Sequence, residues 1–183
     1  MDSGGVIVIT GAMAAGKSTV ADLLASRLPR AAHVRGDLFR RMIVSGRREV
    51  TPRPDPEADA QLALRYRLAA TVADEYARAG FTAVVQDVIL GPDLATFTAM
   101  ITTRPCHVIV LAPRPEILAR REERRPKRGY GEWTPAALDA SLRDETPRIG
   151  LWLDSSDQTP SGTADAILAH VRTSAGDVPA ARG

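Results

Sequence analysis

The sequence predicts an α/β fold of three layers, in which helices flank a five-stranded parallel sheet. Short apolar runs rich in valine and isoleucine recur along the chain, and helical stretches separate them. Most of these runs are continuous rather than alternating, which is typical of strands buried on both faces of a parallel sheet. Such a sheet collects its ligands at the carboxyl ends of its strands. The predicted strands are Val6–Thr10, Ala32–Arg35, Ala83–Val88, His107–Ala112 and Gly150–Leu153.

The helices predicted around these strands account for most of the remaining chain. At 183 residues the sequence has the size of one domain, and we find no internal repeat in it. We therefore expect a single domain over residues 1–173 and a flexible tail over residues 174–183, which are rich in alanine and glycine. The predicted helices are Lys17–Leu28, Leu38–Ser45, Pro56–Ala79, Leu94–Thr102, Pro115–Arg124, Pro135–Glu145 and Gly162–Thr173.

The composition favours a cytoplasmic protein with neither a membrane nor a nucleic acid as its partner. Apolar residues make up 44% of the chain, a usual share for a globular protein. No apolar run reaches the roughly 18 residues of a membrane span, and the run near the N-terminus is too short for a signal peptide. The formal net charge of +2 is too small to favour nucleic acid. The oligomeric state stays open.

A glycine-rich segment between the first predicted strand and the first predicted helix has the pattern of a phosphate-binding loop (P-loop). Its glycines let backbone N–H groups face phosphates, and the helix N-terminus adds positive partial charge. We expect Lys17 to contact the β- and γ-phosphates, Ser18 to bind Mg²⁺ and Thr19 to contact the α-phosphate. The fold class is therefore a three-layer P-loop fold. The predicted nucleotide site comprises Gly11, Ala12, Met13, Ala14, Ala15, Gly16, Lys17, Ser18 and Thr19.

The absence of asparagine from the sequence bears on the choice of nucleotide. GTP-binding switches read guanine with an Asn-Lys-x-Asp segment, and this chain has no asparagine and only two lysines. A nonenzymatic GTP switch therefore loses its main support. We expect ATP with Mg²⁺ as the bound nucleotide. A regulatory module that binds ATP without transferring phosphate remains an alternative.

Two aspartates follow predicted strands and are candidates for chemistry. Asp37 comes directly after the second strand, where a carboxylate could accept a proton from an attacking hydroxyl. It could equally cap the helix predicted to follow it. Asp87, at the end of the third strand, could hold Mg²⁺ through water or contact the acceptor. Arg40 and Arg41 lie one turn beyond Asp37, where they could contact a polar acceptor or face solvent.

A basic, glycine-containing segment over about residues 120–134 is predicted to form a small lid. The helix before it should end ahead of Pro126, and a flexible arginine-rich stretch suits a lid that neutralises charge on the triphosphate. A solvated helix face or a nucleic-acid patch would explain the same arginines. We select Arg124 and Arg128 as catalytic arginines. We place Arg120 beside adenine, opposite the loop after the last strand.

These features together resemble the small P-loop kinases of the nucleoside-monophosphate-kinase-like class, and within it the chloramphenicol phosphotransferase-like family. The resemblance rests on the P-loop, on Arg35-Gly36-Asp37, on the arginine-rich lid and on Asp87-Val88-Ile89-Leu90-Gly91. It covers about residues 6–168. It implies that Asp37 is the base for O-phosphorylation and that the acceptor is a small molecule. The segment 45–56 departs from the family pattern, which leaves the acceptor open.

The predicted function is transfer of the γ-phosphoryl group of ATP to a hydroxyl of a small molecule, such as an antibiotic or related natural product. Asp37 would orient or deprotonate the hydroxyl, and Lys17, Mg²⁺ at Ser18 and the lid arginines would stabilise the transferring charge. Asp87 would support the metal or the acceptor. A nucleoside, nucleotide or sugar kinase would share these motifs and differ only in its acceptor pocket. A polynucleotide end kinase is a further alternative, but it would need a basic channel, and the low net charge argues against it.

Overall fold

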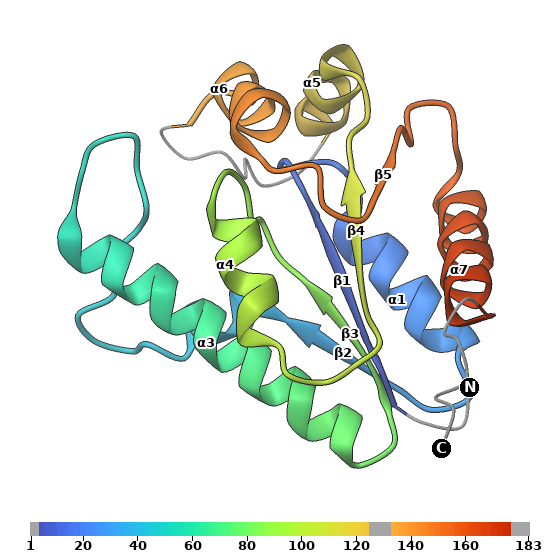
Figure 1. Ribbon diagram of the computed structural model, residues 1–183. Helices are drawn as coiled ribbons and strands as arrows, with labels where there is room; N and C mark the ends of the chain where they lie inside the picture. Colours follow the sequence, from blue (N-terminus) through green and yellow to red (C-terminus); the bar gives the residue numbers. More distant parts are fainter. Residues whose placement is uncertain (1–3, 125–132, 177–183) are drawn as a thin grey trace.

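The computed structural model describes residues 4–124 and 133–176, and it confirms the predicted sheet (Figure 1). Five strands pair in parallel, and each boundary lies within two residues of its predicted position. The central strand is buried along its whole length, as expected where continuous apolar runs form strands covered on both faces. The strands are β1 (Val6–Gly11), β2 (Ala31–Arg35), β3 (Thr82–Gln86), β4 (Cys106–Leu111) and β5 (Leu151–Leu153).

The order of the strands in the sheet is β2-β3-β1-β4-β5. Gln86, the last residue of β3, is opposite Arg35 of β2 and Ile9 of β1. The carboxyl ends of these three strands therefore meet at one edge, with β3 in the middle. Asp87 follows β3 and lies next to the strand that leads into the P-loop, whereas Asp37 lies one strand further away.

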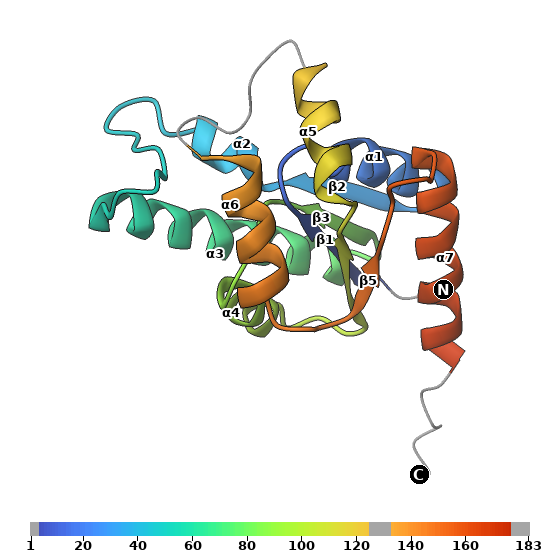
Figure 2. The same ribbon diagram turned by 90° about the horizontal axis from the view of Figure 1, so that it is seen from above.

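Helices cover both faces of the sheet and give the three layers of the prediction (Figure 2). On one face lie α1 (Lys17–Arg27) and α7 (Pro160–Gly176); on the other lie α3 (Pro56–Arg78) and α4 (Asp93–Met100). Three further α-helices are α2 (Gly36–Arg41), α5 (Pro115–Glu123) and α6 (Pro135–Ala140). None of the helices in residues 4–124 and 133–176 is long and apolar enough to cross a membrane.

Three predicted helices differ from the structure by more than two residues at an end. The helix predicted over Leu38–Ser45 is α2, which starts at Gly36 and stops at Arg41, ahead of the left-handed Gly46 (φ 76°). The helix predicted over Pro135–Glu145 is α6 followed by a π-helical turn, Ser141–Glu145. The last helix, α7, continues to Gly176, so residues 174–176 of the predicted tail are helical. Residues 177–183 lie outside the described residues.

Candidate active site

The P-loop connects β1 to α1 and depends on glycine at its two ends. Gly11 has a φ of 145°, and a Cβ atom there would lie 2.4 Å from the carbonyl oxygen of Leu111 on β4. Gly16, the N-cap of α1, is left-handed with a φ of 95°. A side chain at either position would be strained, since L residues rarely adopt these conformations. The two glycines thus let the loop curl tightly ahead of the N-terminus of α1.

The predicted phosphate contact Lys17 lies inside this loop. Its side chain is largely buried, and its Nζ donates hydrogen bonds to the carbonyl oxygens of Gly11 (3.0 Å) and Ala12 (2.8 Å). Its positive charge and the N-terminal N–H groups of α1 therefore act on the same space, which suits the phosphates of a nucleotide. Ser18 is the second residue of α1, in its first turn.

A magnesium ion at this loop would need oxygen ligands from the nucleotide as well as from the protein. The described residues contain no group of three or more His, Cys, Asp or Glu side chains that could hold a metal ion. Protein sites for Mg²⁺ beside phosphates use one or two protein oxygens, with phosphate oxygens and water completing the shell. The Ser18 hydroxyl fits this sparse donor set, and its role as a ligand stays a prediction.

Asp37 is held by two arginines and keeps one carboxylate oxygen without a hydrogen bond. Its Oδ2 lies 2.8 Å from Arg41 Nη2. Its Oδ1 is buried, lies 3.6 Å from Arg35 Nε, and accepts no hydrogen bond within the described residues. The alternative of Asp37 as a helix cap is wrong, because the N-cap of α2 is Arg35 and no side chain caps this helix. The side chain of Asp37 remains 26% exposed as a whole, and the exposed part does not include Oδ1.

Asp87 is almost fully buried and forms a two-point ion pair with Arg65 of α3. Arg65 donates from Nε to Oδ2 over 2.7 Å and from Nη2 to Oδ1. A Cβ atom at Gly36 would lie 1.9 Å from Asp87 Oδ2, so only glycine allows the start of α2 to approach this carboxylate. A metal contact by Asp87 would compete with the ion pair. The metal and acceptor roles of Asp87 stay predictions.

The ion pair belongs to a larger group of charges between α2 and α3. Burial lowers the pKa of Arg65, while the negative charges of Asp37 and Glu49 act in the opposite direction. Arg40 pairs with Glu49, in the loop between these helices. Arg41 pairs with Asp37, and its contact with the acceptor stays a prediction.

In the described part of the lid, Arg121 rather than a predicted arginine contacts the P-loop. Arg121 donates to the carbonyl oxygens of Ala15 (3.3 Å) and Ser155 (3.1 Å), and so joins the P-loop to the loop after β5. Arg120 and Arg124 are exposed, and Arg128 lies outside the described residues. The phase of the helix could have identified Arg121, which follows the fully buried Leu118 by three positions on α5.

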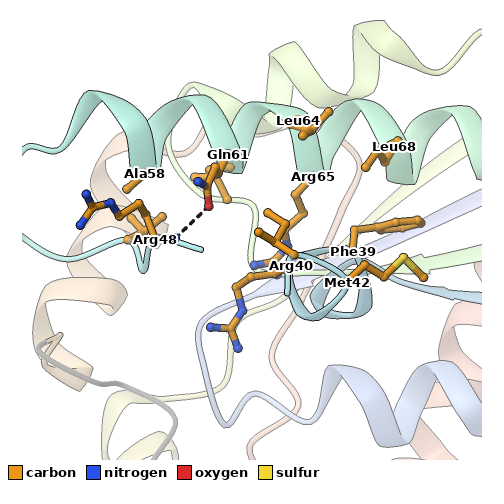
Figure 3. Close-up of a pocket in the computed structure, with 12 residues that line it drawn as sticks. Phe39, Arg40, Met42, Arg48, Ala58, Gln61, Leu64, Arg65 and Leu68 are labelled. Atoms are coloured by element: carbon orange, nitrogen blue, oxygen red, sulfur yellow. Dashed lines mark hydrogen bonds between the residues drawn. The ribbon is translucent and has the colours of Figure 1, made fainter. Parts of the chain in front are cut away.

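A cavity of about 160 Å³ lies between α2, α3 and the loop that joins them (Figure 3). Most of its lining is apolar, and Arg40 and Arg65 extend into its polar side. The sequence pattern indicated Arg40 but not the contribution of α3. Its lining residues Ala58, Leu62, Arg65 and Leu68 recur at helical spacing, which was the available signal.

The sequence of residues 6–146 matches the protein family described as AAA domain. The chain belongs to this AAA-domain family. The match runs from β1 through the π-helical turn and includes the P-loop, Asp37, Asp87 and Arg121. No curated protein matches the sequence as a relative.

Solved structures share the fold of this AAA-domain chain at low sequence identity. A sugar kinase from Janibacter sp. HTCC2649 is 18% identical, with 92% of this chain and 95% of that chain covered and a TM-score of 0.69. The Mycobacterium tuberculosis APS kinase in complex with AMPPNP and APS is 18% identical, with 94% and 99% covered and a TM-score of 0.70. A Deinococcus radiodurans tunicamycin resistance protein is 16% identical, with 92% and 95% covered and a TM-score of 0.64.

These matches show that the chain has the fold of P-loop kinases, with a five-stranded parallel sheet and flanking helices. The narrower resemblance to chloramphenicol phosphotransferase-like proteins is not confirmed by them and stays a prediction.

Proposed function

We propose that this AAA-domain chain is an ATP-dependent kinase that phosphorylates a hydroxyl group of a small molecule bound between α2 and α3. One observation carries the proposal. Asp37 lies at the carboxyl edge of the sheet, where a buried oxygen of its carboxylate accepts no hydrogen bond from the described residues. A carboxylate in this state can accept the proton of a hydroxyl as that hydroxyl attacks phosphorus.

On the donor side, Mg²⁺-bound ATP would supply the γ-phosphoryl group. The N–H groups of the P-loop and the Lys17 ammonium would bind the phosphates and neutralise charge that develops during transfer. The Ser18 hydroxyl would serve as a protein ligand of the metal. Arg121 adds a cation over the P-loop, and Arg124 and Arg128 remain the predicted lid arginines.

On the acceptor side, the Asp37 carboxylate would take the proton while the acceptor oxygen forms its bond to the γ-phosphorus and the bond from that phosphorus to ADP breaks. Arg41 and Arg35 hold the carboxylate in place. Asp87 is less suited to act as the base, because Arg65 engages both of its oxygens. The cavity beside Arg40 and Arg65 would hold the body of the acceptor.

The named activities of the structural relatives support a small acceptor without choosing one. They include a sugar kinase, an APS kinase and a tunicamycin resistance protein. An antibiotic or related natural product is therefore one candidate acceptor, and a sugar or nucleotide is another.

The test is to incubate the protein with ATP, Mg²⁺ and a pooled library of hydroxylated metabolites, nucleosides and antibiotics, and to detect phosphorylated products by mass spectrometry. Asp37→Asn is assayed in parallel, with Asp59→Asn as a control that removes an exposed carboxylate from α3. We expect a product that gains one phosphate, is unchanged with Asp59→Asn and falls at least a hundredfold with Asp37→Asn. Equal product from Asp37→Asn would refute the assignment of the base.

A further inference from the structure

The side chains that line the cavity between α2 and α3 indicate which chemical groups the acceptor carries. Apolar side chains form both of its walls: Phe39, Met42 and Ile43 come from α2 and the residues after it, and Leu62, Leu64 and Leu68 come from α3 (Figure 3). Leu64 and Leu68 are each 39% exposed and Met42 is 69% exposed, so these apolar side chains also extend to the mouth of the cavity. Such a lining favours an apolar group.

The polar groups of the cavity are largely engaged within the protein. The Gln61 amide nitrogen donates to the Gly46 carbonyl oxygen and to Glu57, and its oxygen accepts from the Arg48 backbone N–H, each over 2.9 Å. Arg65 is bound to Asp87, and Arg40 to Glu49. A polyhydroxylated acceptor would therefore leave several of its hydroxyls without partners in this cavity, which is costly for binding.

The volume of the cavity limits the size of the apolar group. It holds about 160 Å³. An apolar protein cavity of about 150 Å³ takes up one benzene molecule. The space therefore fits a single six-membered ring or an aliphatic group of similar size, and a larger body would have to extend out of the mouth.

Arg48 supplies a positive charge at the other end of the cavity, beside Ala58, where its guanidinium points away from the leucines of α3 (Figure 3). It lines the apolar cavity and also a second, open hollow of about 460 Å³ in the loop between α2 and α3. Within the described residues its guanidinium has no ion-pair partner, because Glu49 pairs with Arg40 and Arg47 and Asp55 caps α3. An anionic group that leaves the apolar cavity at this point would meet Arg48 first.

We infer that the acceptor is an alcohol that carries an apolar group of about one ring and an anionic group, a carboxylate or a phosphate, which Arg48 binds. The inference rests on the proposed function only in naming the ligand as the acceptor. The cavity, its apolar walls and the unpaired guanidinium do not depend on phosphoryl transfer.

The test measures binding by ligand-detected NMR titration of the full chain, without turnover. The probes are 4-(hydroxymethyl)benzoate, its neutral methyl ester, benzyl phosphate, glycolate (an acid without a ring) and gluconate. We expect the benzoate or the benzyl phosphate to bind about threefold or more tightly than the ester, a modest factor because Arg48 is exposed. Glycolate and gluconate should bind more weakly than the ester.

Variants of the protein test which side chain binds the anionic group of the probe and which binds its ring. Arg48→Gln should remove the preference for the anion and leave binding of the ester unchanged, whereas Arg67→Gln, which removes an exposed charge from α3 outside the cavity, should have no effect. Leu64→Gln should weaken all ring probes by about threefold or more, and Val44→Gln, a 96% exposed control outside the cavity, should not.

The inference is overturned if the ester binds as tightly as both anions, if gluconate binds more tightly than the ring probes, or if Arg48→Gln and Arg67→Gln behave alike. A dimer in solution that dissociates on Leu64→Gln would also overturn it, because the exposed leucines would then serve self-association. A chain that binds the ring anions but phosphorylates no library compound would instead refute the proposed kinase activity and leave the inference standing.

Discussion

Replacing Arg65 by methionine isolates the energetic role of the ion pair beneath the cavity. Asp87 has a side chain only 2% exposed, and Arg65 supplies hydrogen bonds to both of its oxygens. Methionine keeps most of the aliphatic stem, so the change removes charge rather than packing. Breaking a buried pair on one side costs about 3–5 kcal/mol, because the other charge stays buried and uncompensated. For a chain of this length we expect the melting temperature to fall by about 10 °C.

The assay is urea unfolding at pH 7, which gives the free energy of unfolding of each variant. Arg67→Met removes an exposed arginine from the same helix and should change this free energy by less than about 0.5 kcal/mol. The double variant Arg65→Met with Asp87→Asn should recover much of the loss, because no buried charge is left unpaired. A loss below about 1 kcal/mol in Arg65→Met would refute the reasoning, since Asp87 would then be solvated or stabilised by other groups.

Three further predictions follow from other contacts. Burial alone would raise the pKa of Asp74, but hydrogen bonds from Thr102 and Thr103 lower it from 3.8 to about 2. Because the pKa is lower in the folded protein, the stability that Asp74 contributes should be present above pH 4 and lost as the pH falls toward 2. Thermal unfolding of Asp74→Asn should not show this loss. Arg121→Gln should raise the Kd for AMPPNP about threefold or more, as measured by calorimetric titration. Val50 lines the cavity between α2 and α3, and its carbonyl oxygen accepts a hydrogen bond from Trp133 Nε1 (3.1 Å). Trp133→Phe removes this hydrogen bond, so it should raise KM for the acceptor identified in the library assay and leave KM for ATP unchanged.

Local patterns were enough to predict the sheet and the P-loop. The three inner strands, β1, β3 and β4, contain short runs of valine and isoleucine, and burial on both faces is the physical reason for that composition. The two glycines and Lys17 lie within seven consecutive residues, so their spacing alone defines the loop. Asp37 and Asp87 could be placed at the carboxyl edge because each comes within two residues of the end of a strand.

Contacts between distant segments could not be predicted in this way. Arg65 lies 22 positions before Asp87, and nothing in the sequence around either residue indicates the other as its partner. The strand order also placed β3 between β2 and β1, which a list of strands does not determine. Arg121 contacts the P-loop because it lies on a different side of α5 from Arg120 and Arg124. A run of basic residues does not by itself show which of them lies on that side.

Asp37 and Asp87 lie at the ends of neighbouring strands, but their carboxylates make different contacts. Asp87 lies nearer to the P-loop, yet its contacts fix other parts of the protein: it anchors Arg65, and its close approach to Gly36 defines where α2 begins. Asp37 is the next residue after that glycine, so its position depends on the same contact. Because Arg35 and Arg41 hold Asp37 less completely than Arg65 holds Asp87, the outer aspartate keeps an oxygen without a hydrogen bond from the described residues. The arrangement therefore separates a carboxylate that contacts the start of α2 from the carboxylate that we propose accepts a proton.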